Sequence, residues 1–262
     1  MMTKQQQKGM TLIELMISIA LGMAVTSMVI VVYIGTVTNN VKTLKTTKLN
    51  QELSTLMGVM VNDIRRAGYS FGLTPTDPTA NIFNVFGTTS LTVIKNVDNP
   101  STIIPLGPIA LGDTNGECIL YTYDRSNNGA AEASEFFGFR LFQGAVQMRI
   151  SGSNTTNCNL DADIWTTVTS SDIVITALQF DRQSSACINT AEPNLMDDDV
   201  DGDIDEADEF NCHVTAPSAS DLTVDTQEVK ITLNGHLADD NNVALTLESS
   251  VRVRNDLVRK RI

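Results

Sequence analysis

The sequence predicts an α+β protein: one long N-terminal helix packed on an antiparallel β-sheet head with long loops. Three observations lead to this prediction. Residues 10–34 are apolar except for Glu14, residues 36–68 keep apolar side chains at spacings of three and four, and β-branched and aromatic runs recur further along. A single helix laid against such a sheet is an α+β architecture.

A short leader, residues 1–9, carries Lys4 and Lys8 and ends in Gly9. The apolar run behind it, residues 10–34, places a membrane-spanning helix at residues 10–35, since 25 residues at 1.5 Å each span roughly 37 Å. A secretory signal has its cleavage site after the apolar region, whereas Gly9 precedes it. Cleavage after Gly9 would therefore keep the helix, and the lysines favour a cytoplasmic leader and a periplasmic remainder.

These residues resemble the prepilin class III signal of type IV pilins and type II secretion pseudopilins. Gly9 matches the cleavage position, Met10 the residue that is then methylated, and Glu14 the acid at the fifth position of the mature chain. The resemblance implies that Glu14 pairs with the free amine of a neighbouring subunit, because a carboxylate in an apolar helix is costly unless paired. The alternative is a plain membrane anchor with Glu14 near the interface.

Residues 36–68 are predicted to continue the helix as an amphipathic segment. Gly68 is expected to end it, because glycine adopts the left-handed conformation at low cost. The core-facing positions are Leu49, Leu53, Leu56, Met57, Met60, Ile64 and Ala67. Residues 63–69 also resemble the end of the helix in PilW-type minor pilins.

The head, residues 69–262, is predicted to begin with an irregular connection over 70–108 that holds one strand candidate, 91–95. Partial alternation and β-branched content then predict an antiparallel sheet. The further strand candidates are 118–123, 136–142, 145–150, 173–180, 229–233 and 243–253.

Four cysteines, Cys118, Cys158, Cys187 and Cys212, lie on the predicted periplasmic side. An even number there and the lack of a CxxC spacing favour disulfides over a zinc site. Three pairings are open, of which Cys118–Cys158 with Cys187–Cys212 is favoured. The second bond would close a loop of about 26 residues and contribute on the order of 3 kcal/mol.

That loop contains the motif D-x-D-x-D-G, which predicts a structural Ca²⁺ site over residues 197–208. Oxygen ligands at alternate positions suit a hard cation that takes six to eight oxygens. The predicted ligands are Asp197, Asp199, Asp201, Asp203 through its carbonyl, Asp205 and Asp208, with Glu209 as a substitute for the last. The alternative is a solvated acidic tract, although nine acids in residues 197–209 would repel one another strongly without a counter-ion.

A weaker version of this pattern lies between two predicted strands. Its candidate ligands are Asp124, Ser126, Asn128, Glu132 and Glu135, with Gly129 at the turn. The alternative is a plain hairpin, since Asn-Gly between strands is a common turn.

The net charge and the motifs argue against two classes of function, nucleic-acid binding and catalysis. The net charge of −13 argues against nucleic-acid binding, which needs a basic surface. His213 and His236 are the only histidines, and no nucleophile motif or phosphate loop surrounds them, so no enzyme activity is expected.

The resemblance to PilW-type minor pilins extends to residues 118–149. It implies a single-pass protein of a Gram-negative inner membrane with a periplasmic head, which primes type IV pilus assembly and then sits at the pilus base or tip. It implies, as partners, other minor pilins, the major pilin, the prepilin peptidase, the inner-membrane assembly platform and a pilus-tip adhesin, with adhesion and twitching motility as the processes served. The alternatives are a J-type pseudopilin of a type II secretion system and a membrane-anchored calcium-dependent adhesin.

Overall fold

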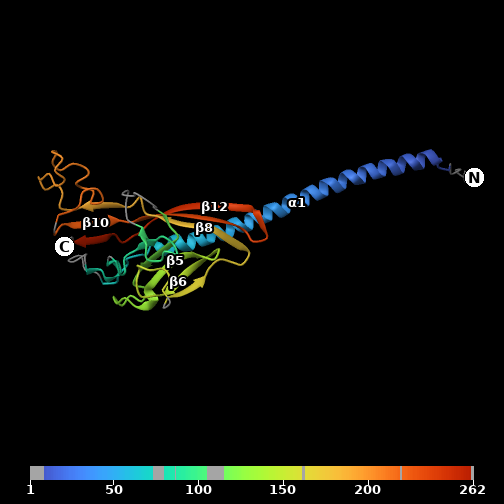
Figure 1. Ribbon diagram of the computed structural model, residues 1–262. Coiled ribbons are helices and arrows are strands. Elements are labelled where there is room, and N and C mark those ends of the chain that lie inside the picture. Colours follow the sequence, from blue (N-terminus) through green and yellow to red (C-terminus); the bar gives the residue numbers. More distant parts are fainter. Residues whose placement is uncertain are drawn as a thin grey trace, which may run out of the picture. The chain divides into compact units, whose positions relative to one another are not determined.

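A computed structural model describes residues 9–72, 80–85, 87–104, 115–160, 163–218 and 220–260. Within these residues one long helix, α1 (Leu12–Ile64), precedes a head made of antiparallel strands (Figure 1). The predicted α+β architecture is therefore confirmed. Residues 1–8 of the leader, with Lys4 and Lys8, lie outside the described residues.

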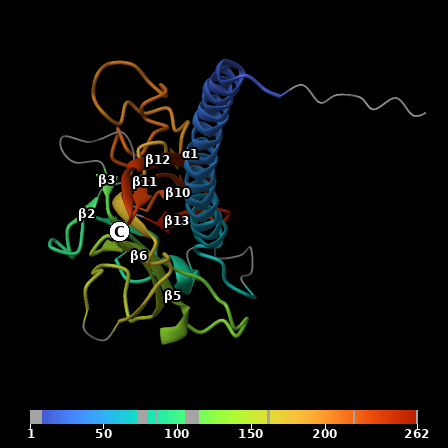
Figure 2. The same ribbon diagram turned by 90° about the vertical axis from the view of Figure 1, so that its right-hand side faces the viewer.

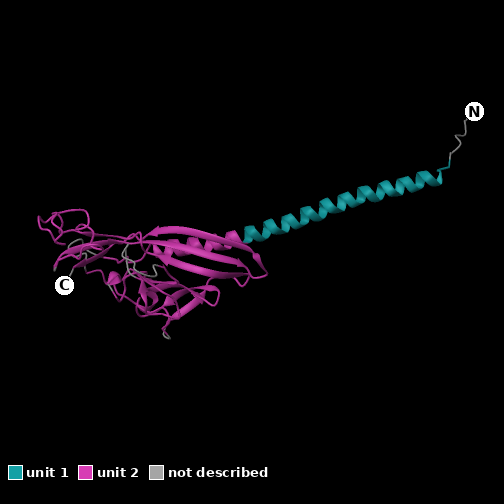
Figure 3. Ribbon diagram, turned by 45° about the horizontal axis from the view of Figure 1, so that its top comes forward, with its two compact units in different colours: residues 1–48 teal, residues 49–262 magenta. Residues whose placement is uncertain are grey.

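The chain divides into two compact units, residues 1–48 and residues 49–262 (Figure 3). Helix α1 contributes to both of them. The second unit therefore contains the last part of α1, from Leu49 onward, together with the predicted head. The reason is that Leu49, fully buried, is the first helical residue to join the hydrophobic core.

The second part of α1 buries the face that its spacing predicts: Leu49, Leu53, Leu56, Met57, Met60 and Ile64 are all buried. The helix ends at Ile64 in a tight turn, in which the Ala67 amide donates to the Ile64 carbonyl at 3.0 Å. Gly68 closes this turn with φ +73°, the left-handed conformation that glycine takes most easily. Its amide donates to the carbonyl of Thr122, which connects the end of the helix to the sheet.

Three antiparallel sheets form the described part of the head. The first contains, in spatial order, β2 (Ile103–Ile104), β1 (Thr92–Ile94), β4 (Cys118–Thr122), β5 (Phe136–Phe142), β6 (Ala145–Ser151) and β7 (Ile164–Thr167). The second contains β12 (Asp240–Arg252), β11 (Glu228–Leu237), β8 (Ile173–Asp181) and β3 (Asn115–Gly116). The third contains β13 (Leu257–Lys260), β10 (Leu222–Thr226) and β9 (Ala186–Asn189).

All seven predicted strands are present, whereas β2, β3, β7, β9, β10 and β13 were not predicted. In the described connections lie two short 3₁₀ helices, η2 (Ile82–Asn84) and η3 (Ala133–Glu135). Figure 2 shows β5 and β6 of the first sheet apart from β11 and β12 of the second.

The C-terminal part of α1 packs against the two larger sheets. On the first sheet, the Asp63 carboxylate accepts hydrogen bonds from the hydroxyls of Tyr121 at 2.6 Å and Tyr123 at 3.0 Å. On the second, Leu53 faces Gly235 of β11, where a Cβ would lie in ordinary van der Waals contact with it at 3.4 Å. The buried core thus joins α1 to both sheets.

Candidate functional site

The N-terminal candidate residues lie at the start of α1. Gly9 and Met10 are exposed and precede the helix. Thr11 and Glu14 form a reciprocal cap: the Thr11 amide and hydroxyl both donate to Glu14 Oε2 at 3.0 Å, and Thr11 Oγ1 accepts from the Glu14 amide at 3.3 Å. Glu14 therefore stabilises its own helix end, a role that the sequence analysis missed.

The first part of α1 presents an apolar surface on all sides. Every residue from 9 to 34 is exposed, including Leu12 at 77% and Val32 at 69%. The few hydroxyls are satisfied within the helix; Ser18, for example, donates to the Glu14 carbonyl at 2.7 Å. In length and composition this is a helix that can cross a membrane. An exposed apolar surface of this size needs lipid or other apolar helices to cover it.

The acidic segment lies between β9 and β10 and is closed by the Cys187–Cys212 disulfide, as predicted. Beside this bond the amide of Asn189 donates to the Phe210 carbonyl at 2.9 Å. The two ends of the segment are thus held together by a covalent bond and a hydrogen bond. We call residues 188–211 the acidic loop.

Hydrogen bonds fold the first half of the acidic loop. The Asp197 carboxylate accepts from the amides of Asp201 at 3.1 Å and Gly202 at 3.0 Å, and Asp201 Oδ1 accepts from Asp203 at 2.9 Å. Gly202 makes the turn with φ +106°. The glycine therefore occupies the turn that the calcium-loop pattern assigns to it.

Two overlapping groups of carboxylates form what we call the outer cluster. Asp197, Asp199 and Glu209 form one, and Asp199, Asp201 and Glu206 form the other; within each group the ligand oxygens lie within 4.8 Å of one another. Both oxygens of Glu206 are buried and have no hydrogen-bond partner. Their burial raises the pKa of Glu206 to about 7. An acceptor-only, oxygen-rich cluster of this kind suits a hard divalent cation.

The outer cluster contains part of the predicted ligand set. Asp197, Asp199 and Asp201 lie with Glu209, the predicted substitute for Asp208, and with Glu206, which was not predicted. Asp205 and Asp208 belong to neither group. The side chain of Asp203, predicted to act through its carbonyl, belongs to neither group.

The backbone explains why Asp205 lies outside the outer cluster. Asp205 has φ +58°, and its Oδ1 accepts the amides of Asn194 at 2.7 Å and Leu195 at 3.0 Å. Its carboxylate therefore turns back toward the start of the loop, where it lies with Glu192 and Glu209.

Two family models match this chain. The prokaryotic N-terminal methylation motif matches residues 4–30, which contain Gly9, Met10 and Glu14. The model for prepilin peptidase-dependent protein B matches residues 42–253, most of the chain. The chain belongs to the prepilin peptidase-dependent protein B family. The comparisons with curated proteins and with solved structures give no match.

Membership of the prepilin peptidase-dependent protein B family makes this a pilin-type protein, and the exposed apolar helix is consistent with an inner-membrane anchor. The family match contains the whole acidic loop and the segment 124–135. Both candidate metal loops therefore belong to the head of this family member.

The weaker loop, residues 124–135, closes on itself. Asp124 accepts the amides of Asn128 at 3.1 Å and Gly129 at 2.9 Å, and Glu135 accepts the amide of Ser126 at 2.9 Å. Asp124, Glu132 and Glu135, all described, do not form a group of three carboxylates of the kind found in the acidic loop. The Asp124 contacts repeat those of Asp197 in the acidic loop, and what distinguishes the two loops is the carboxylate group that these three residues lack. The second calcium site stays a prediction.

The expected Cys118–Cys158 disulfide is not formed in the structure. Both cysteines are free thiols, fully buried in one small apolar cluster. The Cys158 thiol donates to the Asn96 carbonyl at 3.6 Å, and burial, together with the neighbouring Cys158 thiol, raises the pKa of Cys118 well above its usual range. The sequence analysis therefore paired two cysteines that share one buried cluster, but in the structure both are free thiols.

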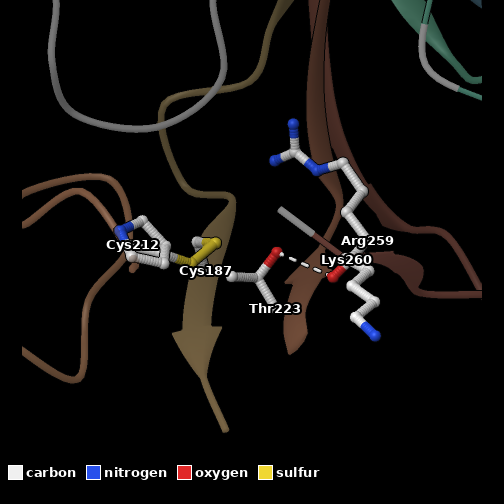
Figure 4. Close-up of a pocket in the computed structure, with 6 residues that line it drawn as sticks. Cys187, Cys212, Thr223, Arg259 and Lys260 are labelled. Carbon is white, nitrogen blue, oxygen red and sulfur yellow. Dashed lines mark hydrogen bonds between the residues drawn. A yellow bond between two sulfur atoms is a disulfide. The ribbon is translucent and has the colours of Figure 1, made fainter. Parts of the chain in front are cut away.

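A pocket lies beside the disulfide (Figure 4). It is lined by Cys187, Cys212, Pro217, Thr223, Arg259 and Lys260. Thr223 Oγ1 donates to the Arg259 carbonyl at 3.5 Å across its wall.

The two histidines occupy structural positions. His213 Nε2 lies 3.6 Å from Asp225 Oδ1, and the Asp225 carboxylate also pairs with Arg259. His236 lies in β11, with Nδ1 2.9 Å from the Leu237 carbonyl. His213 therefore contacts a residue of β10, whereas the His236 contact is with the next residue of its own strand.

Proposed function

We propose that this member of the prepilin peptidase-dependent protein B family is a PilW-like minor pilin. In this role it is cleaved after Gly9 and methylated at Met10 in the inner membrane of a Gram-negative bacterium. It then joins other minor pilins and the major pilin on the assembly platform, primes the type IV pilus, and remains at the pilus base or tip beside an adhesin.

One observation carries the proposal: behind a methylation motif, residues 10–34 expose apolar side chains on every face of the helix. Before assembly, lipid covers this surface. In a filament, the same surface packs against neighbouring stems, and the Glu14 carboxylate pairs with the amine of an adjacent subunit. Assembly thus exchanges one apolar environment for another at little hydrophobic cost.

The proposed role of the acidic loop is to bind a structural Ca²⁺. The support is the outer cluster, in which Asp197, Asp199 and Asp201 come together with Glu206 and Glu209. A bound ion would offset their mutual repulsion and fix the loop, so that the head presents a defined surface to its neighbours in the pilus.

An in-frame deletion tests the pilus role. Surface pili are counted by electron microscopy in the deletion strain, with and without the retraction ATPase, and secretion is measured in parallel. Loss of pili that is relieved when retraction is removed is the result expected of a priming minor pilin.

Unchanged pili with a secretion defect would instead identify a J-type pseudopilin, which shares the methylation motif. An uncleaved leader at Gly9, with pili and secretion both normal, would identify a membrane-anchored adhesin.

A further inference from the structure

A second group of carboxylates lies next to the outer cluster. Glu192, Asp205 and Glu209 have ligand oxygens within 4.8 Å of one another. We call them the inner cluster, because Glu192 is only 8% exposed and Glu209 only 1%. Glu209 belongs to both clusters, so a single buried side chain connects them.

One side-chain oxygen of Glu192, Oε2, indicates that a ligand binds at the inner cluster. Its Oε1 accepts from the side-chain amides of Asn189 at 3.3 Å and Asn194 at 2.9 Å. Its Oε2 is buried and accepts no hydrogen bond from an N–H or hydroxyl group, and burial together with the neighbouring Asp198 carboxylate raises the pKa of Glu192. A buried carboxylate oxygen without a donor is costly and uncommon in folded proteins. The side chains of its cluster are themselves carboxylates, which accept hydrogen bonds but donate none when ionised.

The negative charge of the acidic loop indicates that the ligand of this oxygen is a cation. Ten acidic residues lie between positions 192 and 209, and the same stretch contains no Lys, Arg or His. One divalent ion in the outer cluster would leave most of this charge in place. The inner cluster, which is more buried, would still hold carboxylates without a counter-charge.

The hydrogen bonds that Glu209 accepts leave its carboxylate able to bridge two cations. Its Oε1 accepts from the Asp198 amide, and its Oε2 accepts from the Asp205 amide at 2.8 Å. Each carboxylate oxygen has two lone-pair sites, so one on each oxygen remains for a cation.

We propose that the acidic loop binds two Ca²⁺ ions, one in each cluster, with Glu209 as the bridging carboxylate. The outer ion contacts Asp197, Asp199, Asp201 and Glu206, and the inner ion contacts Glu192 and Asp205. This inference rests on the calcium site proposed above for the outer cluster.

The number of bound ions tests the proposal. The full chain, purified in detergent micelles, is dialysed to equilibrium against ⁴⁵Ca²⁺. Two ions per chain are expected for the wild type and one for Glu192→Gln, which keeps the acceptor for Asn189 and Asn194. Asp205→Asn alters the inner cluster from its other side and should also leave one ion. The double variant Asp199→Asn, Asp201→Asn should retain only the inner ion.

Glu132→Gln, in the weaker loop, is the matched control and should still bind two ions. The proposal is overturned if the wild type binds one ion, if Glu192→Gln and Asp205→Asn both retain two, or if Glu132→Gln loses one. A single ion that disappears in the Asp199, Asp201 variant but persists in Glu192→Gln would leave the outer calcium site standing and remove only the second. Pilus counts are a separate measurement, so neither result decides the pilin role.

Discussion

Glu14 shows how one carboxylate can serve two purposes at different stages. In the isolated chain its Oε2 accepts from the amide and hydroxyl of Thr11, which caps the start of α1. In a filament the same carboxylate is proposed to pair with the amine of a neighbour. The two roles can be separated, because the cap depends on Thr11 and the pairing depends on the charge of Glu14.

We expect Glu14→Gln to be cleaved after Gly9 but to assemble few pili, since the amide cannot neutralise an amine. Thr11→Ala removes the hydroxyl of the cap, worth about 1 kcal/mol, and should assemble almost normally. Immunoblots of leader removal and pilus counts measure the two effects. If Thr11→Ala assembled as poorly as Glu14→Gln, capping and not pairing would explain the defect.

Alkylation can test whether Cys118 and Cys158 are buried free thiols. Burial raises the pKa of Cys118, so the folded protein should resist alkylation by a maleimide at pH 8. Unfolded without reductant, the chain should take up two labels, counted by mass spectrometry. Uptake of no label after unfolding would show that the pair is oxidised, as the sequence analysis expected.

Among the elements, α1 and β4 are joined by the hydrogen bond from Tyr121 to Asp63. Tyr121 is fully buried and donates to a carboxylate at 2.6 Å. Tyr121→Phe should therefore lower the free energy of unfolding by about 1.5–3 kcal/mol. Tyr69→Phe is the matched control, because Tyr69 is 40% exposed and donates at 3.3 Å. Urea unfolding of the full chain in micelles measures both, and equal effects would mean that the Asp63 contact adds nothing.

Calcium should stabilise the acidic loop by mass action. At a free concentration about 100 times Kd, one site adds roughly 2.7 kcal/mol, which raises Tm by about 5–11 °C for a domain of this size. Asp199→Ala with Asp201→Ala should remove the part of this shift that the outer ion contributes and leave only the part due to the inner ion. Ser126→Ala with Asn128→Ala makes the equivalent change in the weaker loop and should retain the full shift. A full shift in the Asp199, Asp201 variant would refute the outer site.

For the molecule as a whole, acid stability depends on His213. Burial lowers the pKa of His213 by more than the attraction of Asp225 raises it, and Arg259 and Arg182 lower it further. The unfolded chain therefore binds this proton more readily than the folded chain, so stability is full above about pH 6.5 and falls with acidification through that value. His213→Gln should reduce the slope of unfolding free energy between pH 7.5 and 5.5. An unchanged slope would assign the loss to other groups.

The sequence predicted the parts of the fold that depend on local pattern. The spacing from Leu49 to Ile64 identified the buried face of α1, and the apolar run of β4 identified its strand. Strand β10 was missed because it contains two threonines and Asp225 and no apolar run, and because it pairs with β9 and β13, which are distant in the sequence.

The candidate metal site was likewise predicted only where it depends on local sequence. The alternating aspartates of the outer cluster follow from a local motif. Glu192 and Glu206 were missed, since they join the clusters only through the fold of the loop, including the turn at Asp205. A sequence motif gives the spacing of its own residues, but it does not show which other side chains of the loop fold back against them.

The disulfide has a consequence for proteolysis. The acidic loop exposes Leu195 at 81% and Val200 at 84%, so a protease can reach its backbone. A cut between Cys187 and Cys212 would leave both fragments covalently joined through the bridge. Strands β10 to β13 would then stay attached to the rest of the head, and the nick would become visible on a gel only after reduction.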